Sequence, residues 1–438
     1  MPAHDPSLPS SKLHALGRAL RHRNYRLYFS GQSLSLIGTW MTRIATGWLI
    51  YRLTGSALLL GTVGFAGQLP VFLLAPVAGV LADRWDRHRV LVVTQILAMI
   101  QSGLLAVLAL TDIITVTHVL VLATCQGLIN AFDMPARQAL VVQMVDDRRD
   151  LPNAIALNSS MVNAARMVGP SVAGLLIGWV GEGVCFLVDA VSYLAVIATL
   201  ILMRLKPPVR PAVPKRVVAE FIGGLRYAAG FPPVRAILAL LALLSLAAMP
   251  YAVLMPIVAS RILHGGAHTL GFLMAASGLG ALGAGVYLAS RSTVLGLGRV
   301  IAAAVAAAGV GLIGLSQSNV LWLSLALMPI IGAGVMIEIA ASNTLLQTMV
   351  DDDMRGRVMA FYTMAFVGTM PFGSLVAGAF ADRFGVPTTL LVGGVACIVG
   401  AAIFLARLPS LRRLVLPIYV RLGIIPEIAN GMNRASDV

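Results

Sequence analysis

The sequence predicts an all-α membrane protein with twelve transmembrane helices in two pseudo-symmetric six-helix bundles. The first observation is composition: of 438 residues, 58% are hydrophobic and 11% are charged, with a mean hydropathy of +0.88. A soluble domain of this size has more polar surface. The second is run length, because apolar stretches such as 58–82 and 390–406 reach or approach the ~20 residues that a helix needs to cross a bilayer. The third is an internal repeat of six spans.

The apolar runs give the predicted spans. They are helices and not barrel strands, because strands that cross a membrane alternate in polarity and are about half as long. The predicted spans are 26–50, 57–82, 90–111, 116–137, 154–178, 184–203, 235–260, 268–289, 297–316, 320–344, 358–381 and 386–406.

The basic residues predict the orientation. With a cytoplasmic N-terminus, all but six of the 32 Lys and Arg residues fall on cytoplasmic loops and tails. The exceptions are Arg52, Arg261 and Arg383 outside, and Arg43, Arg137 and Arg166 within spans. This positive-inside pattern, with an even number of spans, places both termini in the cytoplasm. The basic segment 16–28 then faces anionic lipid, and the net charge of +14 needs no nucleic-acid partner.

Several classes of function are excluded by what the sequence lacks. Cys125, Cys185 and Cys397 all lie within apolar spans, which indicates core residues and neither a disulfide framework nor a metal site. The sequence has no phosphate-binding Gly-Lys-Ser/Thr loop, no HExxH motif and no Gly-x-Ser-x-Gly motif. We therefore expect no enzymatic activity, no metal and no cofactor, and we expect no cleavable signal peptide.

The chain divides near its middle, where a segment rich in Pro and basic residues follows the sixth span. Such a segment is typical of a linker between bundles. The predicted parts are a basic tail (1–25), an N-terminal bundle (26–203), a cytoplasmic linker (204–234), a C-terminal bundle (235–406) and a cytoplasmic tail (407–438).

The two halves resemble each other in sequence. Residues 127–147 align with 332–352 at an offset of 205, which places Asp133 on Glu338. Downstream, 169–174 aligns with 373–378. A repeat of six spans is the sequence signature of a secondary transporter, whose substrate site is expected between the halves near the bilayer midplane.

Two motifs carry a resemblance to the major facilitator superfamily. The segment "GVLADRWDRHR" (79–89) resembles the signature loop of that superfamily, and "ARMVGPSVAG" (165–174) partly resembles its fifth-span antiporter motif. The matching loop residues are Gly79, Asp83, Arg84, Arg87 and Arg89, and the matching fifth-span residues are Gly169, Pro170 and Gly174. Asp86 departs from the pattern, where Gly is usual. The second motif predicts close helix packing, as do the glycines of 270–285.

Three segments, 20–41, 130–141 and 151–159, are similar to the secretion-effector branch of that superfamily, which includes the enterobactin exporter. The resemblance implies a monomeric exporter of small molecules in the bacterial cytoplasmic membrane. Ala123 stands where many proton antiporters of the superfamily have Arg, so the resemblance leaves proton coupling open.

Asp133 and Arg137 lie four residues apart on one helix face near its cytoplasmic end. A charge at membrane depth costs ~2.5–3.5 kcal/mol on insertion scales, so such residues pair or face water. One interpretation is a gating latch, in which Asp133 pairs with Arg84, Arg87 or Arg137. The other is a protonation site.

Glu338 has the same two interpretations. Arg291, in the equivalent loop of the second half, would be its partner in a second latch. Alternatively, Glu338 takes up protons, because Ser342 replaces the Arg of the first half and little basic charge is nearby. We rank Glu338 first and Asp133 second as proton-coupling candidates.

Arg43 and Arg166 lie deep in their spans and also leave two possibilities open. Arg43 pairs with Asp189, or Arg43 and Arg166 are cavity charges that favour anionic substrates. The further residues on spans expected to line the cavity are Gln32, Trp40, Gln68, Asn163, Asn343 and Gln347. Aromatic rings with a few amides suit a large amphipathic substrate.

The sequence therefore predicts a secondary transporter that exports a small amphipathic molecule, such as a siderophore, drug or secondary metabolite, by alternating access. The alternatives within transport are a lysophospholipid flippase and an uptake permease. A non-transporting membrane sensor or assembly partner is the alternative of another class.

Overall fold

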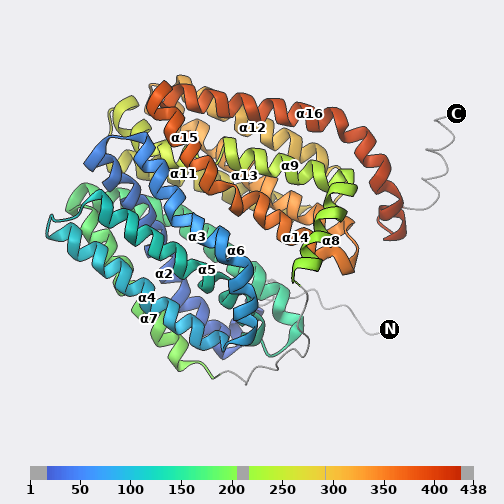
Figure 1. Ribbon diagram of the computed structural model, residues 1–438, viewed down its shortest axis with the longest axis horizontal. Helices are drawn as coiled ribbons and strands as arrows, with labels where there is room; N and C mark the ends of the chain where they lie inside the picture. The colour runs from blue at the N-terminus through green and yellow to red at the C-terminus, as the bar shows by residue number, and fades with distance from the viewer. Residues whose placement is uncertain (1–16, 205–216, 292, 426–438) are drawn as a thin grey trace, which may run out of the picture. The chain divides into compact units, whose positions relative to one another are not determined.

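A computed structural model of the chain describes residues 17–204, 217–291 and 293–425 (Figure 1). Every regular element in these ranges is a helix. This confirms the predicted all-α class.

Eleven helices of the described residues are long and apolar enough to cross a membrane. The predicted first span corresponds to α2 (Arg23–Thr54), whose 32 residues suffice in length. It is not among the eleven, because its sequence is less apolar, with Arg43 and several Ser, Thr, Gly and Gln residues among the apolar ones. The number twelve therefore stays a prediction.

The chain divides into two compact units, and the division does not follow the halves of the sequence. Unit 1 contains Met1–Gly55, Ala66–Ala212 and Gly265–Ala275, and unit 2 contains Ser56–Phe65, Val213–His264 and Ala276–Val438. The first turns of α3 (Ala57–Arg84) thus belong to unit 2, and the first turns of α11 (Ala267–Ser290) belong to unit 1.

Unit 1 is centred on α7, which packs against both α2 and α4 (Figure 1). Besides α2 and α3, its helices are α4 (Arg87–Leu110), α5 (Val116–Met144), α6 (Leu151–Val180) and α7 (Glu182–Leu202), with short 3₁₀ turns η1 (Arg18–Arg21) and η2 (Arg148–Asp150). The helix α5 continues through Pro135.

Local sequence explains where several of these helices start and stop. Asp86 is the N-cap of α4, since its Oδ1 accepts hydrogen bonds from the backbone N–H groups of His88 (3.0 Å) and Arg89 (3.3 Å). This capping role accounts for an Asp where the superfamily pattern has Gly. Gly55 ends α2 with a φ of 64°, a left-handed conformation that glycine adopts without a Cβ penalty.

The segment formed by η1 and the first turn of α2 docks on the protein. The Tyr25 hydroxyl donates to the Ala154 carbonyl (2.7 Å), and the Ala19 N–H donates to Asn153 Oδ1 (2.9 Å). His22 lies 3.1 Å from an Asp150 carboxylate oxygen. Polar groups of this segment therefore contact residues at the start of α6, and its predicted contact with anionic lipid stays a prediction.

Unit 2 is built on α12 and α16, which pack along one another (Figure 1). Its helices are α8 (Val217–Gly230), α9 (Pro232–Ala247), α10 (Tyr251–Ile257), α12 (Leu297–Gln317), α13 (Leu321–Met349), α14 (Asp352–Thr363), α15 (Met370–Phe384) and α16 (Val386–Arg421), with π-helical turns η3 (Val258–Ile262) and η4 (Met364–Gly368). The helix α16 continues to Arg421, well beyond the predicted end of the last span at residue 406.

Candidate functional site

The Asp133 carboxylate is buried in unit 1 and fully hydrogen-bonded. Its Oδ1 accepts from Thr94 Oγ1 (2.9 Å) and Gln95 Nε2 (2.7 Å), both on α4. Its Oδ2 accepts from Arg137 Nε (2.9 Å) and Nη2 (2.6 Å) on its own helix. This short, bidentate pair is among the stronger kinds of ion pair.

The Arg137 guanidinium is held from a second side by α2. Tyr28 lies close enough to hydrogen-bond to it, and the Tyr28 hydroxyl also donates to Asn158 Oδ1 (3.1 Å). Arg84, Arg87 and Arg137 are the partners of Asp133 considered from the sequence, and among the described side chains Arg137 forms the ion pair. The network joins α2, α4, α5 and α6 at one end of unit 1.

The signature segment can be described only in part. Gly79 and the side chains of Asp83 and Arg84 are not among the parts of the chain that the structure describes, so their predicted latch contacts stay predictions. Arg87 interacts with other groups, and Arg89 Nε lies 3.6 Å from Asp86 Oδ2 at the surface.

Glu338, the repeat partner of Asp133, has a different environment in unit 2. It is 0% exposed, and its Oε1 accepts one hydrogen bond, from Ser342 Oγ (3.0 Å). Its Oε2 has no hydrogen-bond partner among the described protein groups. Burying an ionised carboxylate without a cation is very costly, so the neutral acid suits this site.

Arg291 does not pair with Glu338, in contrast to the latch interpretation. Its Nη1 donates to the Tyr287 hydroxyl (3.0 Å) and its Nη2 donates to the Leu295 carbonyl (2.8 Å). These contacts hold Arg291 at the end of α11. A second latch of the predicted kind is therefore absent from the described part of unit 2.

Polar groups lie next to Glu338 along α13 and α14. The Tyr362 hydroxyl donates to the Ile339 carbonyl (2.9 Å) and also interacts with Asn343. Gln347 Nε2 donates to Asn343 Oδ1 at 2.5 Å, and Gln347 is exposed. A polar track thus leads from the half-buried Asn343, five residues after Glu338 on α13, to the surface of unit 2.

Arg43 and Arg166 flank one aromatic ring in unit 1. The Arg43 Cζ lies 5.3 Å and the Arg166 Cζ 5.1 Å from the centre of the Trp40 ring. Both distances are within cation–π range. Arg43 is exposed and Arg166 is half-buried, so two positive charges and an indole form one surface cluster.

Asp189 is not the partner of Arg43, which corrects the pairing considered from the sequence. Its Oδ2 accepts hydrogen bonds from Ser102 Oγ (2.7 Å) and Thr42 Oγ1 (2.8 Å), and it is buried. Hydroxyl groups on α2 and α4, and no guanidinium, satisfy this carboxyl oxygen.

The other cavity candidates of unit 1 differ in exposure. Gln32 is buried, 3% exposed, and therefore does not line an open surface in this conformation. Gln68 is half-buried, and so is Asn163, whose Nδ2 donates to the Ser159 carbonyl (3.0 Å).

The fifth-span motif lies at two tight helix contacts of unit 1. A Cβ at Gly169 would meet the Trp40 side chain of α2 and the Ile37 carbonyl (3.1 Å). A Cβ at Gly174 would lie 2.8 Å from the Gly271 Cα, and one at Gly271 would lie 2.7 Å from the Pro170 carbonyl oxygen. The repeat-related glycine of unit 2, Gly378, makes the matching contact with Gly61.

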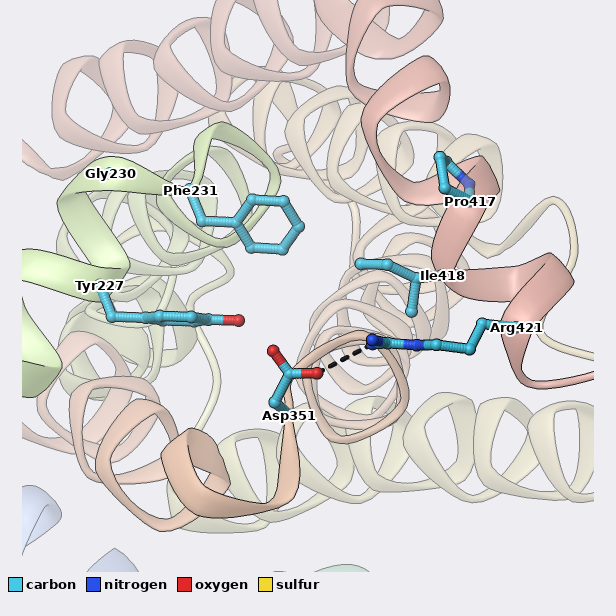
Figure 2. A pocket seen from close by; sticks show the side chains of 7 residues that line it. All are labelled: Tyr227, Gly230, Phe231, Asp351, Pro417, Ile418 and Arg421. Atoms are coloured by element: carbon cyan, nitrogen blue, oxygen red, sulfur yellow. Dashed lines mark hydrogen bonds and ion pairs between the residues drawn. The ribbon is translucent and has the colours of Figure 1, made fainter.

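An open cavity of about 510 Å³ lies at one end of unit 2 (Figure 2). Its walls are Tyr227, Gly230, Phe231, Asp351, Pro417, Ile418 and Arg421. The Arg421 Nη2 donates to Asp351 Oδ1 (2.9 Å), so the charges in this cavity neutralise each other. Within the described residues, no group of three or more His, Cys, Asp or Glu side chains could hold a metal ion.

Solved structures share this fold. The chain superposes on a bacterial homologue of the human lysosomal transporter Spinster with a TM-score of 0.70 at 13% identity, covering 94% of this chain and 99% of that one. It superposes on the nucleoside transporter NupG with a TM-score of 0.69 at 13% identity, covering 89% and 99%. At this identity the likeness concerns the fold alone.

The relatives found by sequence comparison are transporters and efflux proteins. The chain is 24% identical over 385 residues to the staphyloferrin A transporter of Staphylococcus aureus (86% of this chain, 95% of that protein). It is 29% identical over 392 residues to the multidrug efflux pump Tap of Mycolicibacterium fortuitum (85% and 93%), and 25% identical over 391 residues to macrolide efflux protein A of Streptococcus pyogenes (85% and 94%).

The family described as transmembrane secretion effector matches residues 17–416, nearly the whole chain. The match agrees with the helical fold, with the apolar helices and with the classes of the relatives. The chain therefore belongs to the transmembrane secretion effectors of the major facilitator superfamily, and it is a multi-pass membrane transporter and not an enzyme.

Proposed function

We propose that this protein exports a small amphipathic molecule across the bacterial cytoplasmic membrane by alternating access, in exchange for protons. The functions of its relatives, siderophore transport and the efflux of several drugs and of macrolides, support the direction and the substrate class. In this proposal the protein is a monomer with twelve spans, and both of its termini are cytoplasmic.

Glu338 carries the proposal of proton coupling. Its carboxyl group is buried, accepts one hydrogen bond from Ser342 and has one oxygen without a protein partner. Such a group is neutral when buried and can ionise once water reaches it. The polar track of Asn343 and Gln347 supports a route by which water reaches Glu338 when unit 2 changes conformation.

Asp133 is the weaker candidate for proton uptake. Four hydrogen bonds, two of them from the Arg137 guanidinium, already occupy both oxygens of its carboxylate. We propose that Asp133 and Arg137 clamp the ends of α4 and α5 together, while the latch contacts of the signature segment remain predictions.

The cluster of Arg43, Arg166 and Trp40 supports recognition of an anionic or aromatic substrate. A guanidinium at membrane depth does not face lipid, so the exposed Arg43 is expected to face a water-filled path. There, two positive charges attract anions and the indole ring offers an apolar face for stacking.

The proposal is tested by transport in proteoliposomes under an imposed pH gradient. Uptake of an anionic catechol-type compound and of a cationic dye is followed for the wild type, Glu338→Gln and Ser342→Ala. We expect the gradient to drive uptake in the wild type and in Ser342→Ala, which keeps the carboxyl group. We expect Glu338→Gln to lose at least 90% of the gradient-driven rate but to retain exchange of substrate between equal pools.

The outcomes separate coupling from transport. If Glu338→Gln responds to the gradient as the wild type does, Glu338 does not couple transport to protons. If the gradient drives neither compound in the wild type, proton exchange is wrong for this substrate class. Lysophospholipid movement, measured with the same vesicles, would then distinguish a flippase from an exporter.

A further inference from the structure

The helix α16 continues beyond the last predicted span as an amphipathic basic segment. Leu408, Leu411 and Val415 on this extension are buried, while Arg412 is exposed. Leu408 reaches the start of α12, where a Cβ at Gly298 would lie 2.7 Å from the Leu408 Cδ1. The extension is therefore folded against unit 2.

A small cavity of about 150 Å³ lies under this extension, between α9, α12, α13 and α16. Most of its walls are apolar, and they include Ile237, Leu345, Met349, Phe404 and Val415. An apolar pocket of this volume accepts a benzene-sized apolar group. It is therefore large enough for the end of a hydrocarbon chain.

Positive charge borders the same cavity. Both Arg299 and Arg412 line it, and both are exposed. Neither forms an ion pair with a carboxylate within the described ranges. Arg299 also lies in the first turn of α12, where there is no acidic residue and the N-cap residue, Gly296, has no side chain to cap the helix. The partial positive charge of this helix end adds to that of the two guanidinium groups.

We propose that this cavity is a binding site for an anionic phospholipid, with the phosphate at Arg299 and Arg412 and the end of one acyl chain among Leu345, Phe404 and Val415. Basic pockets between transmembrane helices are suited to anionic head groups, and the apolar walls match the tail. In the orientation that the Lys and Arg distribution predicts, this end of unit 2 meets the cytoplasmic leaflet. The bound lipid would hold the α16 extension against α12.

Two other assignments fit the same features less well. Free phosphate would use the arginines but leave the apolar cavity unfilled. The larger cavity in Figure 2 offers an anion no free cation, because Arg421 is paired with Asp351. The combination of an apolar interior and two arginines without carboxylate partners favours a lipid at the smaller cavity.

The test is a native mass spectrometry titration of the delipidated full-length protein in maltoside detergent. The probes are dioleoyl phosphatidylglycerol, dioleoyl phosphatidylcholine and inorganic phosphate. We expect one phosphatidylglycerol per protein to bind at least tenfold more tightly than phosphatidylcholine. Arg299→Gln and Arg412→Gln should each weaken binding about fivefold, the usual contribution of one basic residue near an anionic lipid.

Arg407→Gln is the matched control, because Arg407 is exposed on the same helix but does not line the cavity. It should change binding less than twofold. Val415→Phe fills the cavity and should weaken phosphatidylglycerol binding without changing the charge, with circular dichroism confirming the fold. Equal binding of phosphatidylcholine, displacement of the lipid by millimolar phosphate, or an equal effect of Arg407→Gln would each overturn the proposal.

Discussion

Replacing Asp133 by Asn tests whether this carboxylate holds unit 1 together. Asn keeps the shape of the side chain, and its oxygen can still accept hydrogen bonds from Thr94 and Gln95. Its NH₂ group, however, would face the Arg137 Nε and Nη2 donors, which now lie 2.9 and 2.6 Å from Asp133 Oδ2. Donor would meet donor, and the guanidinium would lose its counter-ion.

The magnitude follows from the burial of the two side chains. Removing one partner of a buried ion pair costs about 3–5 kcal/mol. The side chains of Asp133 and Arg137 are 8% and 22% exposed, so water can hydrate Arg137 in part, and the lower end applies. We expect Asp133→Asn to lower the free energy of unfolding by about 3 kcal/mol.

The assay is reversible unfolding of the purified protein in mixed micelles, followed by circular dichroism. The double variant Asp133→Asn/Arg137→Gln removes both charges and lets the two amides pair, so we expect it to lose only about 1 kcal/mol, one ordinary hydrogen bond. The double-mutant cycle should thus give a coupling of about 2 kcal/mol or more. If Asp133→Asn is as stable as the wild type, or if the two single losses simply add, Asp133 and Arg137 are not a clamp.

Two further predictions concern the other sites. Arg43→Ala and Arg166→Ala should each raise the half-saturating concentration of an anionic substrate about fivefold, as expected for one charge in a hydrated path. They should lower that of a cationic dye, because they remove a repulsive charge. Concentration-dependent uptake measures both, and an equal change in the same direction for the two compounds argues against charge recognition. Gly174→Ala should lower the free energy of unfolding by about 1–3 kcal/mol, because its Cβ would lie 2.8 Å from the Gly271 Cα. Gly283→Ala, where a Cβ meets nothing within 4 Å, should not destabilise the protein in the same unfolding measurement, and equal losses would contradict the packing argument.

Much of the fold could be predicted from the sequence because the bilayer sets the length of its helices. Run length alone located eleven helices that the structure also shows as long and apolar. The division into units could not be predicted in the same way. It depends on contacts such as Gly61 with Gly378 and Gly174 with Gly271. Small residues in a sequence indicate that helices pack closely there, but they do not identify the partner helix.

The charged residues of the candidate site were found from the sequence, but most of their partners were not. Thr94, Gln95 and Ser102 interrupt the apolar run of α4. These polar residues are the feature of the sequence that could have predicted contacts between α4 and buried carboxyl groups. In a membrane helix the face toward lipid and the face toward the protein are both apolar. The hydrophobic periodicity of the sequence therefore does not show toward which neighbouring helix a polar residue points. The helix rotation that brings Ser102, and not Arg43, to Asp189 is set by packing between helices.

Asp133 and Glu338 show how a repeat can create two different environments at one position. Four residues after the carboxylate, the first half has Arg137 and the second half has Ser342. A guanidinium at that position gives a bidentate ion pair, whereas a hydroxyl gives a single hydrogen bond and leaves one carboxyl oxygen without a partner. The first arrangement occupies both carboxyl oxygens and ties α5 to α4. The second stabilises the buried acid only while it holds a proton, which makes the protonation of Glu338 depend on its exposure to water. Because only the carboxyl group that gains and loses its proton can couple transport to a gradient, we expect coupling to depend on the second half and stability on the first.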